Sequence, residues 1–214
     1  MLPQIRTLSG LTNDVDGVCV AQTMADAGYL ALNGAVVSTA YDTNGIAILG
    51  AAQIIRIDSV GDDSLVTFTV TGKNENHNTI SEDVTGANAG TAATTKYFKT
   101  VDSVYASAAT ADDVNVGATL VGGARSATIA CNWRSQDFKV GLGVNISGTL
   151  TSSVQQTLDN VMDASITPTW SDTTALNGLS ASNIGNIAFP VRGVRLILTA
   201  FTSGSATLNY IQSA

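Results

Sequence analysis

The sequence is poor in charged residues, which occupy 13% of its 214 positions, about half the share of an ordinary soluble protein. Threonine, serine, alanine, glycine and asparagine take their place. A surface with so few charges is simpler to explain if neighbouring protein covers much of it. A secreted β-protein with a hydroxyl-rich surface would have the same composition, so both explanations stay open.

Histidine and cysteine are nearly absent. His77 is the single histidine and stands in an Asn-rich turn, so no catalytic triad or dyad is visible. Cys19 and Cys131 have no second ligand at metal-binding spacing. They form either a disulfide or, as we favour, two buried thiols of a protein that folds in a reducing cytosol. We therefore expect no enzyme activity, no cofactor and no metal.

Long apolar runs and basic stripes are also missing. No stretch reaches the length of a transmembrane helix, and the first eight residues lack the basic and apolar segments of a signal peptide. No cluster of Lys and Arg is interleaved with aromatic residues, as nucleic-acid binding would require. We therefore expect neither a membrane nor nucleic acid among the direct partners.

The most frequent pattern in the chain is the alternation of apolar and polar residues. In Leu65–Thr71 apolar side chains alternate with threonines, which is the period of a strand with one buried face. Such segments recur at about ten-residue spacing between glycine-rich turns, a pattern typical of sandwiches and barrels. We predict an all-β fold of two antiparallel β-sandwich domains, Ig-like or jelly-roll-like: an N-terminal arm (1–16), an acidic domain (17–120) and a near-neutral domain (121–214). Residues 17–50 could instead cross to the second sandwich.

Glycines and turns define the finer expectations. Gly86–Thr91 is predicted as a loop, and Leu120–Arg125 as a linker broken at Gly122-Gly123. Residues 149–161 fit an amphipathic helix or a strand, and the Thr/Ser-rich start favours the strand. On the strand near residues 138–146, Gly141 and Gly143 share one face, which predicts that another backbone or a bulky ring lies close to them.

Charge divides the chain. Residues 1–120 have five basic and thirteen acidic residues, a net charge of −8, whereas residues 121–214 have five and four, a net charge of +1. A near-neutral surface is easier to desolvate against a partner. We therefore expect the second half to dock and the first half to face solvent.

Two acidic features resemble cation sites. Thr12–Gly17 superficially resembles the start of a calcium loop, but the first ligand position is Thr12 and the twelfth is Thr23 instead of glutamate. Asp62-Asp63 and Asp112-Asp113 could meet at one end of a sandwich and hold a cation. Turn residues that accept backbone hydrogen bonds are the simpler explanation, and we prefer it.

Large side chains in small-residue surroundings indicate an interface. Trp and Arg dominate the energetics of protein–protein contacts, although both tryptophans could equally cap the second core. The arm adds apolar residues that would lie on a neighbour or on their own domain. The candidate interface residues are Leu2, Ile5, Trp133, Arg134, Trp170, Arg192 and Arg195.

Three stretches carry a resemblance to a known group. Residues 66–117 contain VTFTVTG, VTGANAGT and TTKYFKTVDSV, and residues 138–158 and 189–212 contain FKVGLGVNIS and FPVRGVRLILTAF. This series, over most of residues 17–212, resembles structural proteins of tailed-bacteriophage virions. The shared motifs contain no catalytic residues.

The resemblance implies a structural component of a phage particle, assembled in the host cytoplasm. We expect a decoration or cement protein that binds the major capsid protein and copies of itself, as a trimer. A neck, tail-tube or fibre-attachment protein is the main alternative. A carbohydrate-binding β-sandwich, using Trp133 and Trp170, is the alternative from another class.

Overall fold

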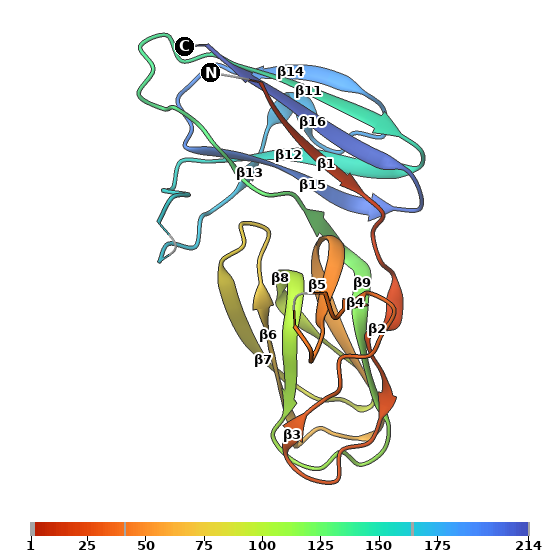
Figure 1. The fold of residues 1–214 in the computed structure, drawn as a ribbon. Coiled ribbons are helices and arrows are strands. Elements are labelled where there is room, and N and C mark those ends of the chain that lie inside the picture. Colours follow the sequence, from red (N-terminus) through yellow and green to blue (C-terminus); the bar gives the residue numbers. More distant parts are fainter. Residues whose placement is uncertain (1–2, 41, 164, 214) are drawn as a thin grey trace. The chain divides into compact units, whose positions relative to one another are not determined.

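The computed structural model describes residues 3–40, 42–163 and 165–213. Strands make up 59% of the chain, and among the described residues the 3₁₀ turn η1 (Thr174–Leu176) is the single helical element. The sheets are antiparallel and pack in a sandwich-like arrangement (Figure 1). The predicted all-β fold class is confirmed.

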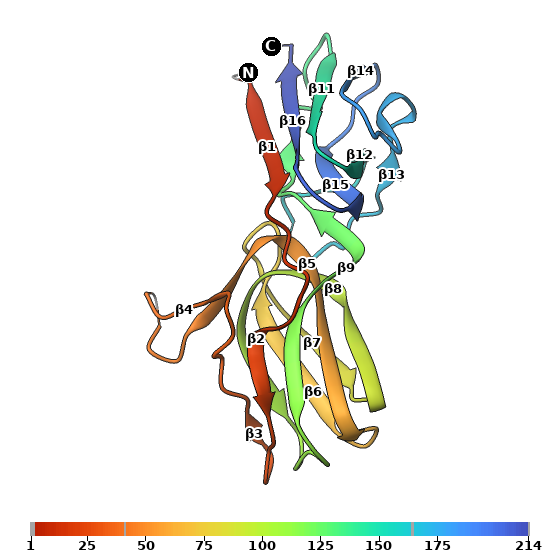
Figure 2. The ribbon, with the colours of Figure 1, turned by 90° about the vertical axis from the view of Figure 1, so that its right-hand side faces the viewer.

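The chain folds as two compact units. Unit 1 contains residues 1–10 and 123–214, and unit 2 contains residues 11–122. The first unit is therefore built from both ends of the chain, with unit 2 inserted between them. Residues that we expected in an arm form strand β1 (Gln4–Ser9), which pairs antiparallel with β16 (Ser205–Gln212) along its whole length (Figure 2).

Unit 2 is built around two long strands, β5 (Ile46–Asp62) and β8 (Asn88–Ala106). Its sheet has the order β9-β5-β8-β6-β7, with β2 on β9, β3 on β8 and β4 on β5. Its other strands are β2 (Asp14–Gln22), β3 (Gly28–Tyr29), β4 (Val37–Ser38), β6 (Thr67–Lys73), β7 (Thr79–Thr85) and the first part of β9 (Val114–Arg125).

Strand β6 has the alternation that the sequence predicts. Phe68 and Val70 are fully buried in the core of unit 2, whereas its threonines lie on the other face. There Thr69 donates to Asp83 over 2.7 Å across the β6–β7 hairpin. The period of two therefore separates a packed face from a hydroxyl face, as the physics of the pleated strand requires.

The predicted loop at Gly86–Thr91 is wrong in its second half, because β8 already begins at Asn88. Asn88, Gly90 and Thr91 pair with Asp62, Ser59 and Asp58 of β5. The small residues of this segment show no alternation of apolar and polar side chains, so the sequence did not indicate a strand. Strand pairing uses backbone groups, however, and the long strand β5 continues to pair with β8 where the apolar pattern has ended.

Unit 1 has two sheets. One has the order β1-β16-β11-β14, and the other contains β13-β12-β15, with β10 and residues 124–125 of β9 also on β15. The segment 149–161 is a strand over most of its length, as favoured. The strands are β10 (Ile129–Ala130), β11 (Val140–Ser147), β12 (Leu150–Thr157), β13 (Ser171–Asp172), β14 (Asn183–Ile187), β15 (Gly193–Phe201) and β16.

The linker expected at Leu120–Arg125 is part of strand β9, which runs without interruption to Arg125. Gly122-Gly123 nevertheless marks the division between the units, and both glycines have positive φ. A Cβ on Gly123 would lie 1.6 Å from the Leu198 carbonyl oxygen. The glycine therefore lets the chain turn without leaving the hydrogen-bonded ladder.

The four-stranded sheet of unit 1 has one buried and one outer face. Val140, Leu142 and Val144 of β11 point into the core with Leu208 and Tyr210 of β16. The predicted close neighbour of the two β11 glycines on the opposite face is absent from the described chain. A Cβ there would come no nearer than 3.9 Å at Gly141 and 3.8 Å at Gly143, which is ordinary contact.

Candidate protein interface

A short turn after β10 presents Trp133. Cys131 N donates to the Arg192 carbonyl over 3.0 Å. The Asn132 backbone is held on both sides by Gln212, whose Oε1 accepts from Asn132 N at 2.9 Å and whose Nε2 donates to Asn132 O at 2.8 Å. Gln212 itself is buried. This scaffold fixes residue 133 beside residue 192, which are far apart in the sequence.

Two cations lie close to the ring of Trp133. The guanidinium carbons of Arg134 and Arg192 lie 4.7 and 5.3 Å from the centroid of its ring. The Trp133 residue is 39% exposed, and each such cation–π contact contributes about 0.5–1 kcal/mol at an exposed site. The structure therefore brings together three of the predicted interface residues, and we call them the Trp133 cluster.

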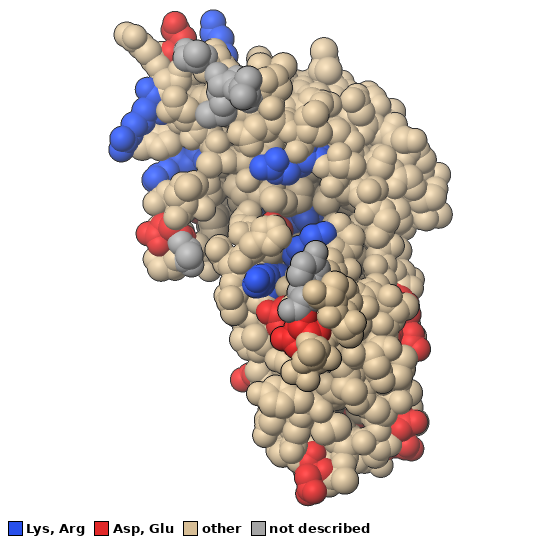
Figure 3. Space-filling model, viewed as in Figure 1, with Lys and Arg blue, Asp and Glu red and all other residues tan. Residues whose placement is uncertain are grey.

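The unit that contains this cluster differs from the other unit in net charge. Unit 1 contains six basic and four acidic residues, a net charge of +2, and unit 2 contains four and thirteen, a net charge of −9. On the face seen in Figure 3, most of the charged side chains of unit 2 are acidic, whereas those of unit 1 are mostly basic. The net charges of the two units therefore differ more than those of residues 1–120 and 121–214.

Trp170 and Arg195 form a separate group within unit 1. Arg195 lies 4.1 Å from the Trp170 ring centroid and is only 5% exposed. Its Nε and Nη2 donate to Gln155 Oε1 over 2.9 and 2.7 Å, and Gln155 Nε2 donates to Asp172 over 3.0 Å. Burial and hydrogen bonding favour a structural role for this pair, since they hold β13 and its approach against β12 and β15.

The arm residues have different outcomes. Leu2 lies outside the described residues. Ile5 lies on the outer face of β1 and is 58% exposed. Two other isoleucines on this face, Ile184 of β14 and Ile211 of β16, were missed by the sequence reasoning. In β16, Leu208 and Tyr210 are buried, and Ile211 is the next residue in the alternation, on the opposite face of the strand. The period-two pattern of the sequence could therefore have placed Ile211 on the outer face.

The four aspartates considered as a cation site do come near each other. A Cβ on Gly61 would lie 3.0 Å from Cβ of Asp112. Asp63 Oδ1 accepts from Ala111 N at 2.8 Å, Asp62 accepts from Ser64 N at 3.1 Å, and Asp113 accepts from Thr23 Oγ1 at 2.6 Å. The hydrogen bonds from Ser64 lower the pKa of Asp62. These contacts favour the turn explanation that we preferred.

Neither acidic feature forms a metal-binding group. Within the described parts of the chain, no three His, Cys, Asp or Glu side chains gather closely enough to hold a metal ion. Residues 14–17, once compared with a calcium loop, belong to strand β2. A hydrogen bond with Asp14 and the nearby charge of that carboxylate raise the pKa of Asp16.

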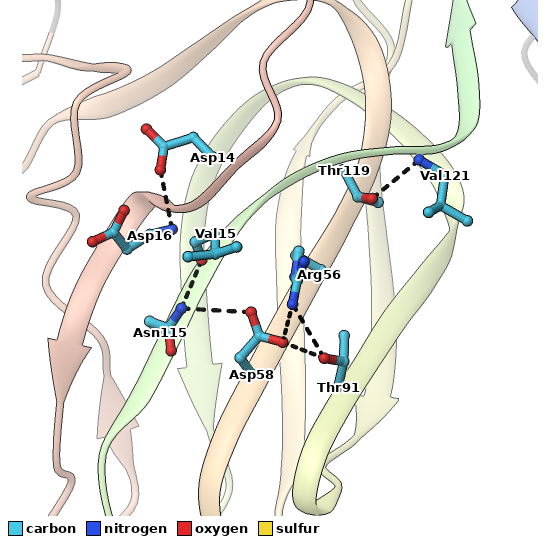
Figure 4. A network of polar contacts seen from close by, with 9 residues as sticks. All are labelled: Asp14, Val15, Asp16, Arg56, Asp58, Thr91, Asn115, Thr119 and Val121. Atoms are coloured by element: carbon cyan, nitrogen blue, oxygen red, sulfur yellow. Dashed lines mark hydrogen bonds and ion pairs between the residues drawn. The ribbon is translucent and has the colours of Figure 1, made fainter. Parts of the chain in front are cut away.

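A polar network inside unit 2 links four strands (Figure 4). Arg56 Nη2 of β5 donates to Asp58 Oδ1 at 2.5 Å and to Thr91 Oγ1 of β8 at 3.2 Å, and Thr91 also donates to Asp58. Asn115 of β9 donates to the Val15 carbonyl of β2 at 2.8 Å. Asn115 Nδ2 also donates to Asp58 Oδ2 over 3.5 Å, so the network ties the four strands together.

Both cysteines are free thiols and both are buried, one in each unit. Burial raises the pKa of Cys19 to about 12 and also raises that of Cys131. The favoured alternative of two buried thiols is therefore confirmed. A thiol with so high a pKa is a poor nucleophile at neutral pH.

No family model, curated protein or solved structure matches the chain. In the described residues, the structure contains no helix of the length and hydrophobicity that a membrane crossing needs.

Proposed function

We propose that the chain is a structural protein of a tailed-bacteriophage particle, which decorates the capsid and stabilises it. The observation that carries the proposal is the Trp133 cluster, an exposed tryptophan with two guanidinium groups close to its ring. Trp and Arg are the residues that most often dominate the binding energy of protein interfaces. The resemblance of residues 66–117 and 189–212 to virion structural proteins supports the proposed class of partner.

The proposed mechanism is mechanical. Unit 1 docks on the major capsid protein through the Trp133 cluster, whose ring supplies apolar area and whose arginines pair with carboxylates of the partner. Unit 2, with its net charge of −9, stays in solvent and keeps the particle surface soluble. Individually modest contacts, repeated over a shell, hold the capsid subunits together.

The carbohydrate-binding alternative draws less support. Both tryptophans that would stack on a sugar already have a guanidinium group over the ring. The faces available to a sugar ring are therefore reduced, and decoration remains our proposal.

Binding to expanded shells that lack the protein tests the proposal. Trp133→Ala should weaken co-sedimentation with the shells about 30-fold, the equivalent of about 2 kcal/mol for a hot-spot residue. Lys139→Ala, at another exposed cation of unit 1, is the matched control and should bind as the natural protein does. Thermal melts of both variants show whether folding is intact.

Failure has a defined form. If the natural protein does not bind the shells, or if Trp133→Ala binds equally well, the docking proposal is wrong. Copy number in purified particles separates the virion alternatives, because hundreds of copies favour decoration and a single ring of copies favours the neck.

A further inference from the structure

The outer face of the four-stranded sheet in unit 1 is uncharged and partly apolar. One row across the sheet runs Ile5, Asn209, Gly143, Ile184, each residue directly opposite the next on the neighbouring strand. In the adjacent row Ile211 lies opposite Gly141. Ile184 is 80% exposed and Ile211 56%. Within the four strands no residue of this face is charged, and Lys139 stands one position beyond its end.

The two glycines of β11 have no explanation inside their own unit. Neither has positive φ, and a Cβ at either position would meet nothing nearer than 3.8 Å in the described chain. Glycine weakens the interior of a strand, by roughly 0.5–1 kcal/mol relative to alanine. A strand interior that keeps glycine without an internal reason is typical of a place where another chain comes close.

The two glycines of β11 therefore leave a trough in this face. Ile184 of β14 borders it opposite Gly143, and Ile211 of β16 borders it opposite Gly141. Asn209 of β16 lies between Gly143 and Ile5 of β1. A second sheet packs face to face at about 10 Å when large side chains of one face fit between those of the other. An isoleucine from outside can enter the trough only because no side chain fills it.

We propose that this face binds the same face of a second copy of the chain. The face is complementary to itself: each copy presents isoleucines that can enter the glycine trough of the other copy. Having no charge within the strands, two identical faces meet without repulsion and without the cost of desolvating ions. A partner with charges at its surface would lose their hydration on this face and gain no ion pair there.

The available area is enough for a weak dimer. Strands β11 and β16 have eight residues each, β1 has six and β14 has five. At about 3.3 Å per residue and a strand spacing of about 4.8 Å they cover roughly 430 Å². Two such faces bury roughly 850 Å² in total, which is the size of a weak, transient interface. We expect a dissociation constant on the order of 10 μM. The contact is two-fold, so it predicts dimers where the sequence analysis expected a trimer.

Sedimentation velocity over a micromolar concentration series tests this inference with the purified full chain alone. The natural protein should shift from monomer to dimer. Ile184→Asp places a charge in the uncharged contact and should weaken the dimer more than 100-fold, as expected for an unpaired buried charge. Leu65→Asp, at an apolar residue of unit 2 that is 95% exposed, is the matched control and should leave the dimer unchanged.

The double variant Gly141→Ala/Gly143→Ala separates association from folding. Both Cβ atoms fit the monomer, so the melting temperature should stay equal or rise, while the filled trough weakens the dimer about 10-fold or more. A natural protein that stays monomeric, a trimer mass, or a dimer that tolerates both Ile184→Asp and the double variant overturns the inference. Because no shell is present, the outcome is independent of the docking proposal.

Discussion

The two units are made of similar antiparallel structure and differ in what their surfaces offer. Unit 2 has a net charge of −9, and its outward strand faces carry threonines and carboxylates that bond to each other, as in the pair Thr69 and Asp83. Unit 1 has a net charge of +2, an uncharged outer sheet face and an exposed tryptophan. This difference in surface chemistry is the basis of our proposal that unit 1 docks on a partner while unit 2 faces solvent.

The tryptophans make this comparison measurable, because both of them belong to unit 1. Indole emission therefore reports the unfolding of unit 1, whereas far-UV circular dichroism reports both units. Each of the following changes should affect one unit more than the other.

The largest expected effect comes from the core of unit 2. Phe68→Ala removes a fully buried ring and should lower the free energy of unfolding of unit 2 by about 3–5 kcal/mol. In urea, the transition seen by circular dichroism should split, with a first step that leaves indole emission unchanged. Leu208→Ala, at an equally buried residue of unit 1, should shift the emission midpoint instead. Coincident shifts of both probes in both variants would show that the units unfold together.

A buried amide gives the next largest effect. Gln53 is fully buried, accepts from Thr12 N at 3.0 Å, and donates to the carbonyls of Thr12 and Thr119 at 2.7 and 3.1 Å. Gln53→Ala leaves these backbone groups unpaired, which should cost unit 2 about 2–3 kcal/mol in urea unfolding.

Gln22 is its natural control. It also accepts one backbone hydrogen bond and donates two, but it is only partly buried. Water can replace the lost bonds, so Gln22→Ala should cost less than Gln53→Ala. Equal losses in the two variants would contradict the role assigned to burial.

Alkaline pH should produce a smaller, gradual effect in unit 2. The folded-state pKa of Cys19 is raised to about 12 from its ordinary value of 9.0. Its contribution to stability is therefore complete below pH 9 and is lost as the pH rises towards 12, by at most about 1.4 kcal/mol per pH unit. Cys19→Ala should flatten this decline in urea midpoints measured by circular dichroism. An unchanged slope would mean that other groups control the alkaline transition.

Local patterns predicted the elements better than their partners. The period-two pattern of Leu65–Thr71 is a property of one strand, so it identified the buried faces of Phe68 and Val70. The ladder that joins Gln4 to Tyr210 depends on residues at opposite ends of the chain, and no local pattern carries that register. For the same reason the expected arm is in part a strand of unit 1.

The candidate site was also predicted in part. Tryptophan and arginine were selected by type, but the sequence did not tell that Arg192 reaches Trp133 and that Arg195 is buried beside Trp170. The outer isoleucines needed the pairing of four strands before they formed one face. Gly141 and Gly143 were noticed as unusual, yet only the structure showed that nothing in their own unit explains them.

The insertion of unit 2 between the two parts of unit 1 has a consequence for synthesis on the ribosome. Strand β1 precedes unit 2 in the sequence, and its partner β16 follows unit 2. Unit 2 is a continuous segment and can fold while translation continues, whereas the sheet that contains β1 cannot form until β16 has been made. The surfaces of unit 1 that we propose for docking therefore need synthesis to pass β16, so a chain truncated before this strand would lack them.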